Sequence, residues 1–380
     1  MNTQKVTQLF KGIAIFIIIL CHSHQTFTLP GKMNDILSLL QTGVQLFLIL
    51  SSFGLCFSYQ KKPVNWLKFM KQRFSKIAVL YWFAIGLATI YRCVYAFSMH
   101  NSILKAINPI GIITNVLFLH GFSPDNVINN QIVRGGWYMG TIAILYSVFP
   151  LLFRLYFKKG ENCKNTRMYA FPIIVFAVTT VLHLILKRYI FFNSINKTVL
   201  QLAPFSLGFT LFELQKTNTL NKVKFPVFKG IFFAVLACLL YFSESVISFA
   251  YIFNIGIAFF YLLVSFLKND ILITAINSDK TPAIRFFNVF GKYSYAIYLT
   301  HSYIAFDFCY VFTTIMSRIY INDLLWFIVL QPIVFALSYC VGKCFYVVVS
   351  KISRSNKSWE HGGVKFTPLL FFFTMLCIAQ

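Results

Sequence analysis

Acidic residues, and charged residues in general, are scarce in this chain of 380 residues. It contains 10 Asp and Glu against 34 Lys and Arg, and charged residues make up only 12% of the sequence. Soluble globular proteins carry about 25% charged residues, whereas 58% of the residues here are hydrophobic. The composition excludes a disordered chain, a collagen-like fibre and an ordinary cytosolic enzyme. It predicts an all-α fold, a polytopic bundle of membrane-spanning helices.

The sequence also lacks the motifs of several common chemistries. It has no Walker loop, no Gly-rich dinucleotide turn and no His-Glu-x-x-His helix. None of its nine Cys forms a Cys-x-x-Cys pair, and Cys340 with Cys344 provides too few ligands for a metal site. We therefore expect no metal and no bound cofactor. The chemistry that remains is acid–base catalysis by histidine rather than hydride or phosphoryl transfer.

The apolar runs are long enough for about ten transmembrane helices. We expect them at 8–28, 37–59, 74–97, 136–157, 170–190, 198–215, 227–243, 246–267, 291–315 and 322–350. The run 107–120 reads better as an interfacial or re-entrant segment. Residues 1–350 then form one transmembrane domain, followed by a cytoplasmic or interfacial tail, 351–380, whose apolar run 366–379 is too short to span.

The net charge of +24 comes mainly from basic residues that lie between the apolar runs. With the N-terminus inside, most of them fall in cytoplasmic loops, as the positive-inside rule requires. This distribution predicts that both chain ends are cytoplasmic. Membrane topology thus explains the positive net charge, so we expect no nucleic-acid partner.

Ionisable side chains inside spans are costly and mark candidate functional sites. The candidates are His22, His24, His183, His301 and Asp307, with Arg134, Trp137 and Tyr138 at the mouth of the fourth span and Gln45 in the second. Lys11 and His22 are 11 residues apart, so they share one helix face about 16 Å apart along the axis. That face either lines a channel or combines a topology anchor with a packing residue. His24 points elsewhere, and His183 is isolated among apolar residues.

The span 291–315 carries two polar stripes. Ser294, Tyr298 and His301 share one face, and a second stripe runs through Thr300, Tyr303, Asp307 and Tyr310. Two such stripes place the helix inside the bundle or beside water, or they form hydrogen bonds between packed helices. At the cytoplasmic start of the third span, Arg73 and Lys76 lie one turn apart and suit anionic phosphates, or they anchor the topology.

Four segments follow one another along the chain: KGIAIFIIILCH at 11–22, GVQLFLILSSFG at 43–54, Arg73 with Lys76 and Tyr81, and GKYSYAIYLTH at 291–301. In this order they resemble membrane acyltransferase family 3, the integral-membrane O-acyltransferases that modify surface polysaccharides. A weaker match joins Trp137 to Tyr146. The chain departs from the family at Lys11, where Arg is usual, at Gln45, where an acid is usual, and at Ile142, where the family often has Glu.

The resemblance implies transfer of an acyl group, most often acetyl, from acyl-CoA as co-substrate to a hydroxyl of a glycan. It implies that His22 is the general base or a transient acyl acceptor. It also implies that Lys11, Arg73 and Lys76 bind the CoA phosphates on the cytoplasmic side of a bacterial cytoplasmic membrane.

The other candidates have weaker assignments. We expect Arg134, Trp137 and Tyr138 to shape the acceptor side, and Gln45, Tyr298 and His301 to support the site. We hypothesise that Asp307 orients His22 or a substrate hydroxyl. A transporter or flippase, or a polymerase acting on lipid-linked glycan, explains buried polar groups equally well and stays open at this point.

Overall fold

The computed structural model describes residues 3–98, 109–120, 132–157, 165–187, 198–243, 247–278, 281–316 and 322–359. Every regular element within these ranges is a helix, which confirms the all-α prediction. The helices of the first half are α1 (Thr3–Ser23), α2 (Gly31–Ser38), α3 (Gly43–Lys61), α4 (Trp66–Ser98), α6 (Pro109–Val116), α7 (Trp137–Tyr156) and α8 (Asn165–Leu186). Those of the second half are α10 (Leu202–Lys216), α11 (Pro226–Phe242), α12 (Tyr251–Lys268), α13 (Asp270–Ser278), α14 (Pro282–Ser302), α15 (Cys309–Met316) and α16 (Asp323–Trp359).

Among the described residues, seven helical segments are long and apolar enough to cross a membrane. They are Gln4–Thr26, Gly31–Lys61, Trp66–Ser98, Trp137–Tyr156, Arg167–Leu186, Ser248–Lys268 and Asp323–Ser353. Each coincides with one of the ten expected spans to within a few residues, except that the second and third begin earlier. The chain is therefore a multi-pass membrane protein, whereas ten spans and the N-in, C-in orientation stay predictions.

The other three expected spans are also helical but differ in length or continuity. Helices α10 and α11 have 15 and 17 residues. The span expected at 291–315 is divided: α14 begins earlier, at Pro282, and a π-helical segment, Tyr303–Phe308, separates it from α15. Because π-helices add a residue to the turn, they change which side chains face the bundle and often occur at functional sites.

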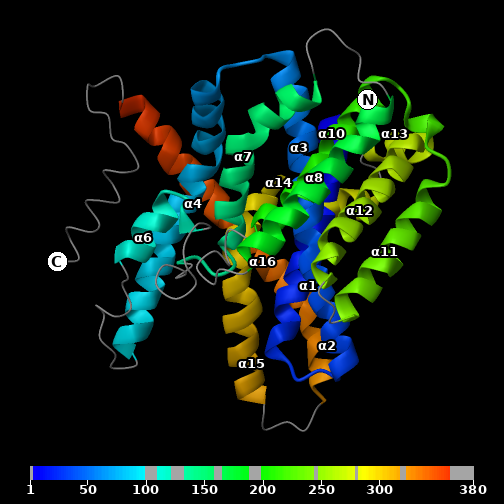
Figure 1. Ribbon diagram of the computed structural model, residues 1–380. Coiled ribbons are helices and arrows are strands. Elements are labelled where there is room, and N and C mark those ends of the chain that lie inside the picture. Colours follow the sequence, from blue (N-terminus) through cyan, green and yellow to red (C-terminus); the bar gives the residue numbers. More distant parts are fainter. Residues whose placement is uncertain are drawn as a thin grey trace.

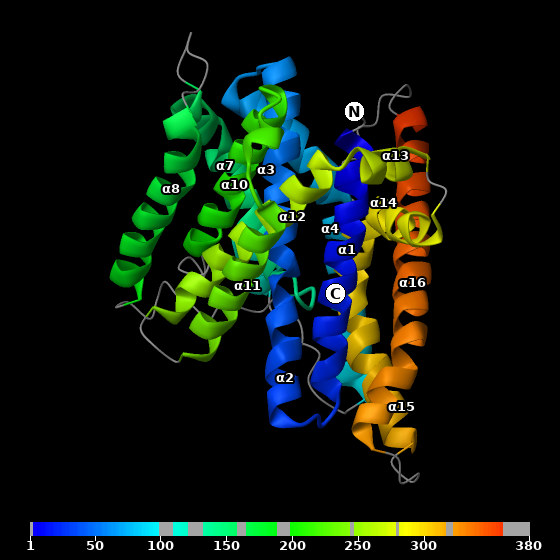
Figure 2. The same cartoon turned by 90° about the vertical axis from the view of Figure 1, so that its right-hand side faces the viewer.

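Two groups of helices surround α1 and α3 (Figures 1 and 2). Figure 2 shows α8, α11 and α12 on one side and α14 with α16 on the other. Helix α1 packs most closely against α14, and α3 packs against α10. The first group exposes many large apolar side chains, including Ile173 on α8 and Phe232 on α11. Such faces are typical of helices that contact lipid.

Glycine allows the closest helix contact in the bundle. A Cβ atom on Gly12 of α1 would overlap the carbonyl oxygen of Phe287, and one on Gly291 of α14 would overlap that of Gln8. Glycine lets helix backbones approach closely in membranes. His22 also lies ten residues beyond Gly12, as His301 lies ten beyond Gly291. The two helices therefore run parallel and in register, and they bring their histidines to the same level.

Two further segments were given a separate expectation, the interfacial run 107–120 and the tail after residue 350. Within the run 107–120, α6 is a short helix of eight residues. Helix α16 continues without a break past residue 350 to Trp359. The rest of the expected tail, including 366–379, lies outside the described residues, so its role stays a prediction.

Candidate active site

The centre of the candidate site is a pair of histidines from the parallel helices α1 and α14. The ring centroids of His22 and His301 are 5.2 Å apart. His301 is fully buried, and its Nδ1 lies 2.7 Å from the carbonyl oxygen of Tyr298. The Nδ1 atom of His22 is buried and has no hydrogen-bond partner among the described residues. Two imidazoles in contact provide the acid–base groups that the sequence predicted from His22 alone.

The segment before α7 is held against the histidine pair through its backbone. The Tyr298 hydroxyl donates to the carbonyl oxygen of Gly135, and the Ser302 hydroxyl donates to that of Arg134 at 3.1 Å. Gly135 has a φ of +71°, a left-handed conformation that glycine adopts without steric cost. This backbone shape lets two neighbouring carbonyl groups face α14, and it fixes the start of α7 beside the site.

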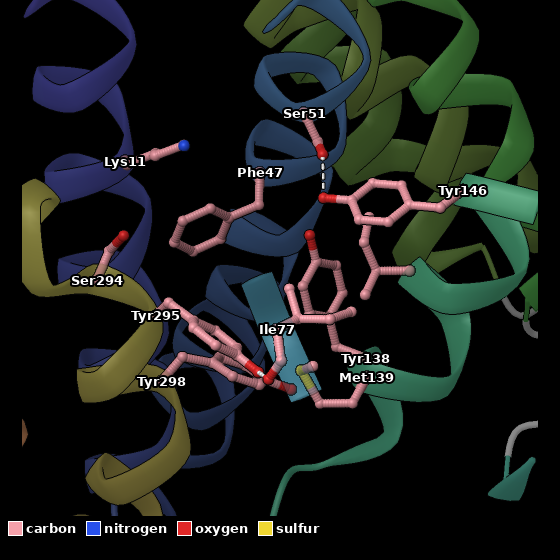
Figure 3. Close-up of a pocket in the computed structure, with 11 residues that line it drawn as sticks. Lys11, Phe47, Ser51, Ile77, Tyr138, Met139, Tyr146, Ser294, Tyr295 and Tyr298 are labelled. Carbon is pink, nitrogen blue, oxygen red and sulfur yellow. Dashed lines mark hydrogen bonds between the residues drawn. The ribbon is translucent and has the colours of Figure 1, made fainter. Parts of the chain in front are cut away.

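A cavity of about 210 Å³ lies on the Lys11 side of the pair (Figure 3). Five helices line it, with Lys11 from α1, Phe47 and Ser51 from α3, Ile77 from α4, Tyr138, Met139, Ile142 and Tyr146 from α7, and Ser294, Tyr295 and Tyr298 from α14. Figure 3 shows the Lys11 amine directed into the space between α1 and α3. The wall is thus apolar and aromatic, with hydroxyl groups and one cation, as in many small-molecule sites.

Tyr298 connects this cavity to the histidines. It lines the cavity, its ring lies 5.6 Å from that of His301, and 5.5 Å from that of Tyr138. The predicted face of Ser294, Tyr298 and His301 is therefore confirmed as one continuous surface, with its first two residues in the cavity wall. The predicted face of Lys11 and His22 on α1 likewise lies along α14, with Lys11 at the cavity and His22 in the histidine pair.

Arg73 lies close to the cavity, whereas Lys76 does not contribute to its wall. The Arg73 guanidinium donates to the Ser58 hydroxyl at 2.6 Å, lies over the Phe69 ring at 5.5 Å, and lies near the cavity residue Tyr146. Lys76, one turn further along α4, is exposed. The two cations thus occupy different environments despite their shared helix face.

On the far side of the histidine pair, a second polar cluster surrounds Asp307 in the π-helical segment. Asp307 meets the guanidinium of Arg134 at 2.5 Å and accepts a hydrogen bond from the Tyr91 hydroxyl at 3.1 Å. The Arg134 guanidinium also lies 5.9 Å from the centre of the Tyr303 ring. Both carboxylate oxygens of Asp307 therefore have partners other than His22, and its hypothesised role in orienting His22 or a substrate hydroxyl stays a prediction.

Two further candidates lie apart from the pair. Gln45 is buried between α3 and α10, where its amide donates to the side-chain oxygen of Gln201 at 2.9 Å. Trp137 is half-buried at the start of α7 and contacts the ring of Tyr138. Tyr138, expected on the acceptor side, and Tyr298, expected to support the site, both line the cavity.

Several residues around the site were not proposed as site residues from the sequence. Ser51 and Tyr146 join their hydroxyls at 3.0 Å in the cavity wall, and the Tyr295 hydroxyl donates to the backbone of Ile77 at 2.6 Å. Ser302 lies beside His301. Tyr295 and Ser302 belong to or adjoin the segment 291–301, so helical spacing within that segment is the signal that points to them.

Comparison with known proteins gives one match that covers most of the chain. A family model described as an acyltransferase domain, the model of acyltransferase family 3, matches residues 8–343. This range includes both histidines, the cavity and the Asp307 cluster. No curated protein and no solved structure matches.

Proposed function

Because the chain belongs to acyltransferase family 3, we propose that it transfers an acyl group from acyl-CoA to a hydroxyl of a cell-surface or exported glycan. Family membership and the apolar helices show a membrane acyltransferase. Acetyl as the acyl group, CoA as its carrier, a glycan as acceptor and a bacterial cytoplasmic membrane as the location belong to the proposal.

The histidine pair is the observation that carries the proposed chemistry. A general base needs a nitrogen whose lone pair is not already engaged, and His22 has a buried nitrogen without a partner among the described residues. As the acceptor oxygen attacks the thioester carbonyl, His22 takes the hydroxyl proton. The carbon–sulfur bond then breaks, and the CoA thiolate leaves and is protonated.

The lining of the cavity supports a donor with negative charge at one end. Lys11 lies at one end of the cavity wall, and Tyr298 connects the other end to His301. Lys11 and His22 are separated by about 16 Å along α1. CoA has phosphates at one end and the thioester at the other, so Lys11, with Arg73 nearby, complements the phosphates while the thioester approaches the histidines.

The Asp307 cluster supports an acceptor with sugar rings. It combines an ion pair with the aromatic rings of Tyr91 and Tyr303, and Tyr91 is exposed. Aromatic faces pack against the apolar faces of sugars, while their hydroxyls and the ion pair form hydrogen bonds with sugar hydroxyls. In this arrangement the donor and the acceptor approach the histidines from opposite sides.

The test uses inside-out membrane vesicles that contain the full chain, radiolabelled acetyl-CoA and a panel of glycan acceptors. We expect the wild type to release CoA and label a glycan. His22→Ala should lower the rate about 10²- to 10⁴-fold, which is the usual contribution of a general base.

His24→Ala is the matched control. His24 lies two residues further on and contacts the Ser38 hydroxyl at 3.2 Å, so its loss should leave the rate within about threefold. Full activity of His22→Ala at equal expression would refute the base. Absence of CoA release from the wild type with every acceptor would refute the proposed donor.

A further inference from the structure

His301 holds one proton in a fixed position. Its Nδ1 lies 2.7 Å from the Tyr298 carbonyl oxygen, and a carbonyl oxygen can only accept a hydrogen bond. The hydrogen therefore resides on Nδ1. In the neutral ring this leaves the lone pair on Nε2. The backbone of α14 thus determines which nitrogen of His301 can accept a proton.

The neighbouring hydroxyl does not occupy that lone pair. Ser302 Oγ lies 3.5 Å from His301 Nε2 but 3.1 Å from the carbonyl oxygen of Arg134. A hydroxyl has one hydrogen to donate, and the shorter contact is the stronger hydrogen bond. Since the Ser302 hydrogen points to Arg134, Nε2 of the fully buried His301 keeps its capacity to accept a proton.

His22 completes a pair that can share a proton. The ring centroids are 5.2 Å apart, a separation that one bridging water can span for proton transfer. Two imidazolium charges at this distance in a buried site would repel strongly. The pair therefore takes up one additional proton, which either ring can hold.

The two rings face different halves of the site. His301 contacts Tyr298, which lines the cavity. The ring centroids of His22 and Phe306 are 5.7 Å apart, and the guanidinium of Arg134 lies 6.0 Å from the centroid of the same Phe306 ring. His301 is thus nearer the proposed donor, and His22 is nearer the proposed acceptor cluster.

We propose that His22 and His301 form a proton relay, in which His301 Nε2 carries the proton from His22 to the departing thiolate. This inference rests on the proposed function. The acceptor hydroxyl loses its proton to His22 as the new oxygen–carbon bond forms. His22 passes a proton to Nε2 of His301. When the carbon–sulfur bond breaks, Nε2 gives its proton to the CoA sulfur, and both rings return to the neutral state.

The charged and titratable groups near the relay come from several elements. His24 follows α1 and interacts electrostatically with His22, Tyr298 precedes His301 on α14, and Arg134 adjoins it through Ser302. Within the described residues, the side chain of His24 bonds Ser38 and that of Arg134 bonds Asp307 rather than either ring of the pair. The relay therefore consists of the two imidazoles.

His301→Asn separates the relay from the structural role of His301. The asparagine amide can still donate to the Tyr298 carbonyl as Nδ1–H does, but it has no basic nitrogen at the Nε2 position. We expect kcat with acetyl-CoA at pH 7 to fall about 100-fold, with KM for acetyl-CoA within about threefold of the wild type. His183→Asn, a change of another buried histidine on α8, is the matched control and should behave as the wild type.

The pH profile identifies the proton acceptor. A cysteine thiol ionises at about pH 8.5, and the alkyl thiol of CoA, which has no adjacent electron-withdrawing backbone, ionises at a higher pH. Towards the upper end of the profile, at about pH 10, the thiolate can therefore leave without a proton. The deficit of His301→Asn should shrink to less than about tenfold there, whereas that of His22→Ala should persist. An unchanged kcat at pH 7, or a deficit that is constant from pH 6 to 10, overturns the relay. If His22→Ala is inactive while His301→Asn is normal, the relay fails and the proposed function stands; if the wild type releases no CoA, the proposed function itself fails.

Discussion

Lys11 and Arg134 are cations on opposite sides of the same histidine pair, and they differ in their partners. Arg134 meets Asp307 at 2.5 Å, in a pair whose side chains are 43% and 31% exposed. Lys11 lines the cavity, and in the part of the chain that the structure describes it has no acidic partner. A half-buried cation without an acid loses hydration and gains no compensation. The difference indicates that Arg134 organises the protein, whereas Lys11 is available to an anionic ligand.

Among changes to the cations around the histidine pair, the largest expected effect comes from removing the charge of Lys11. A charge-assisted hydrogen bond contributes about 1.5–3 kcal/mol, so Lys11→Met should lower kcat/KM for acetyl-CoA about 10- to 100-fold, mainly through KM. Lys11→Arg retains the charge and should lose much less. Steady-state CoA release measures both. An unchanged KM in Lys11→Met would show that Lys11, like Arg134, does not bind an anionic donor.

Arg73 and Lys76 allow the same contrast within one helix. Arg73 is half-buried and lies near the cavity residue Tyr146, so Arg73→Gln should raise KM for acetyl-CoA about fivefold to tenfold. Lys76→Gln is the matched control: an exposed charge is screened by salt and should change KM less than about twofold. Titrations of CoA release against acetyl-CoA give both values. If the two changes raised KM equally, Arg73 would have no special role in binding the CoA phosphates.

The smallest effect is expected at the neutralised cation. Because the Arg134–Asp307 pair is partly exposed, its coupling free energy should be about 1 kcal/mol or less. Asp307→Asn should lower Tm in detergent by about 2 °C or less and leave KM for acetyl-CoA unchanged. A double-mutant cycle with Arg134→Gln measures the coupling. A rise in KM comparable with that of Lys11→Met would show that Asp307 affects donor binding.

The helical repeat explains which parts of the site could be predicted from sequence. Spacing along one helix placed Lys11 with His22, and Ser294 with Tyr298 and His301, because the 3.6-residue period fixes faces within a helix. The structure confirms both faces. The apolar composition predicted the all-helical fold, because only helices and closed barrels satisfy their backbone hydrogen bonds in lipid.

Contacts between helices were harder to predict. Asp307 was hypothesised to orient His22 or a substrate hydroxyl, and in the structure it lies in the π-helical segment and pairs with Arg134 and Tyr91. Gln45 was expected to support the site, and its amide donates to Gln201, directly before α10. Neither partner has a sequence spacing that relates it to these residues, because rotation and register between helices depend on packing.

The backbone contact between Gly12 and Gly291 has a mechanical consequence. The two helices can rotate relative to each other about this contact, and each histidine lies ten residues, or about 15 Å, from it. A change of about 4° in the angle between α1 and α14 therefore moves one imidazole about 1 Å relative to the other. A displacement of that size can change a rate about 100-fold. A change in the thickness of the surrounding bilayer tilts helices and would thus change the rate of acyl transfer without any contact with a substrate.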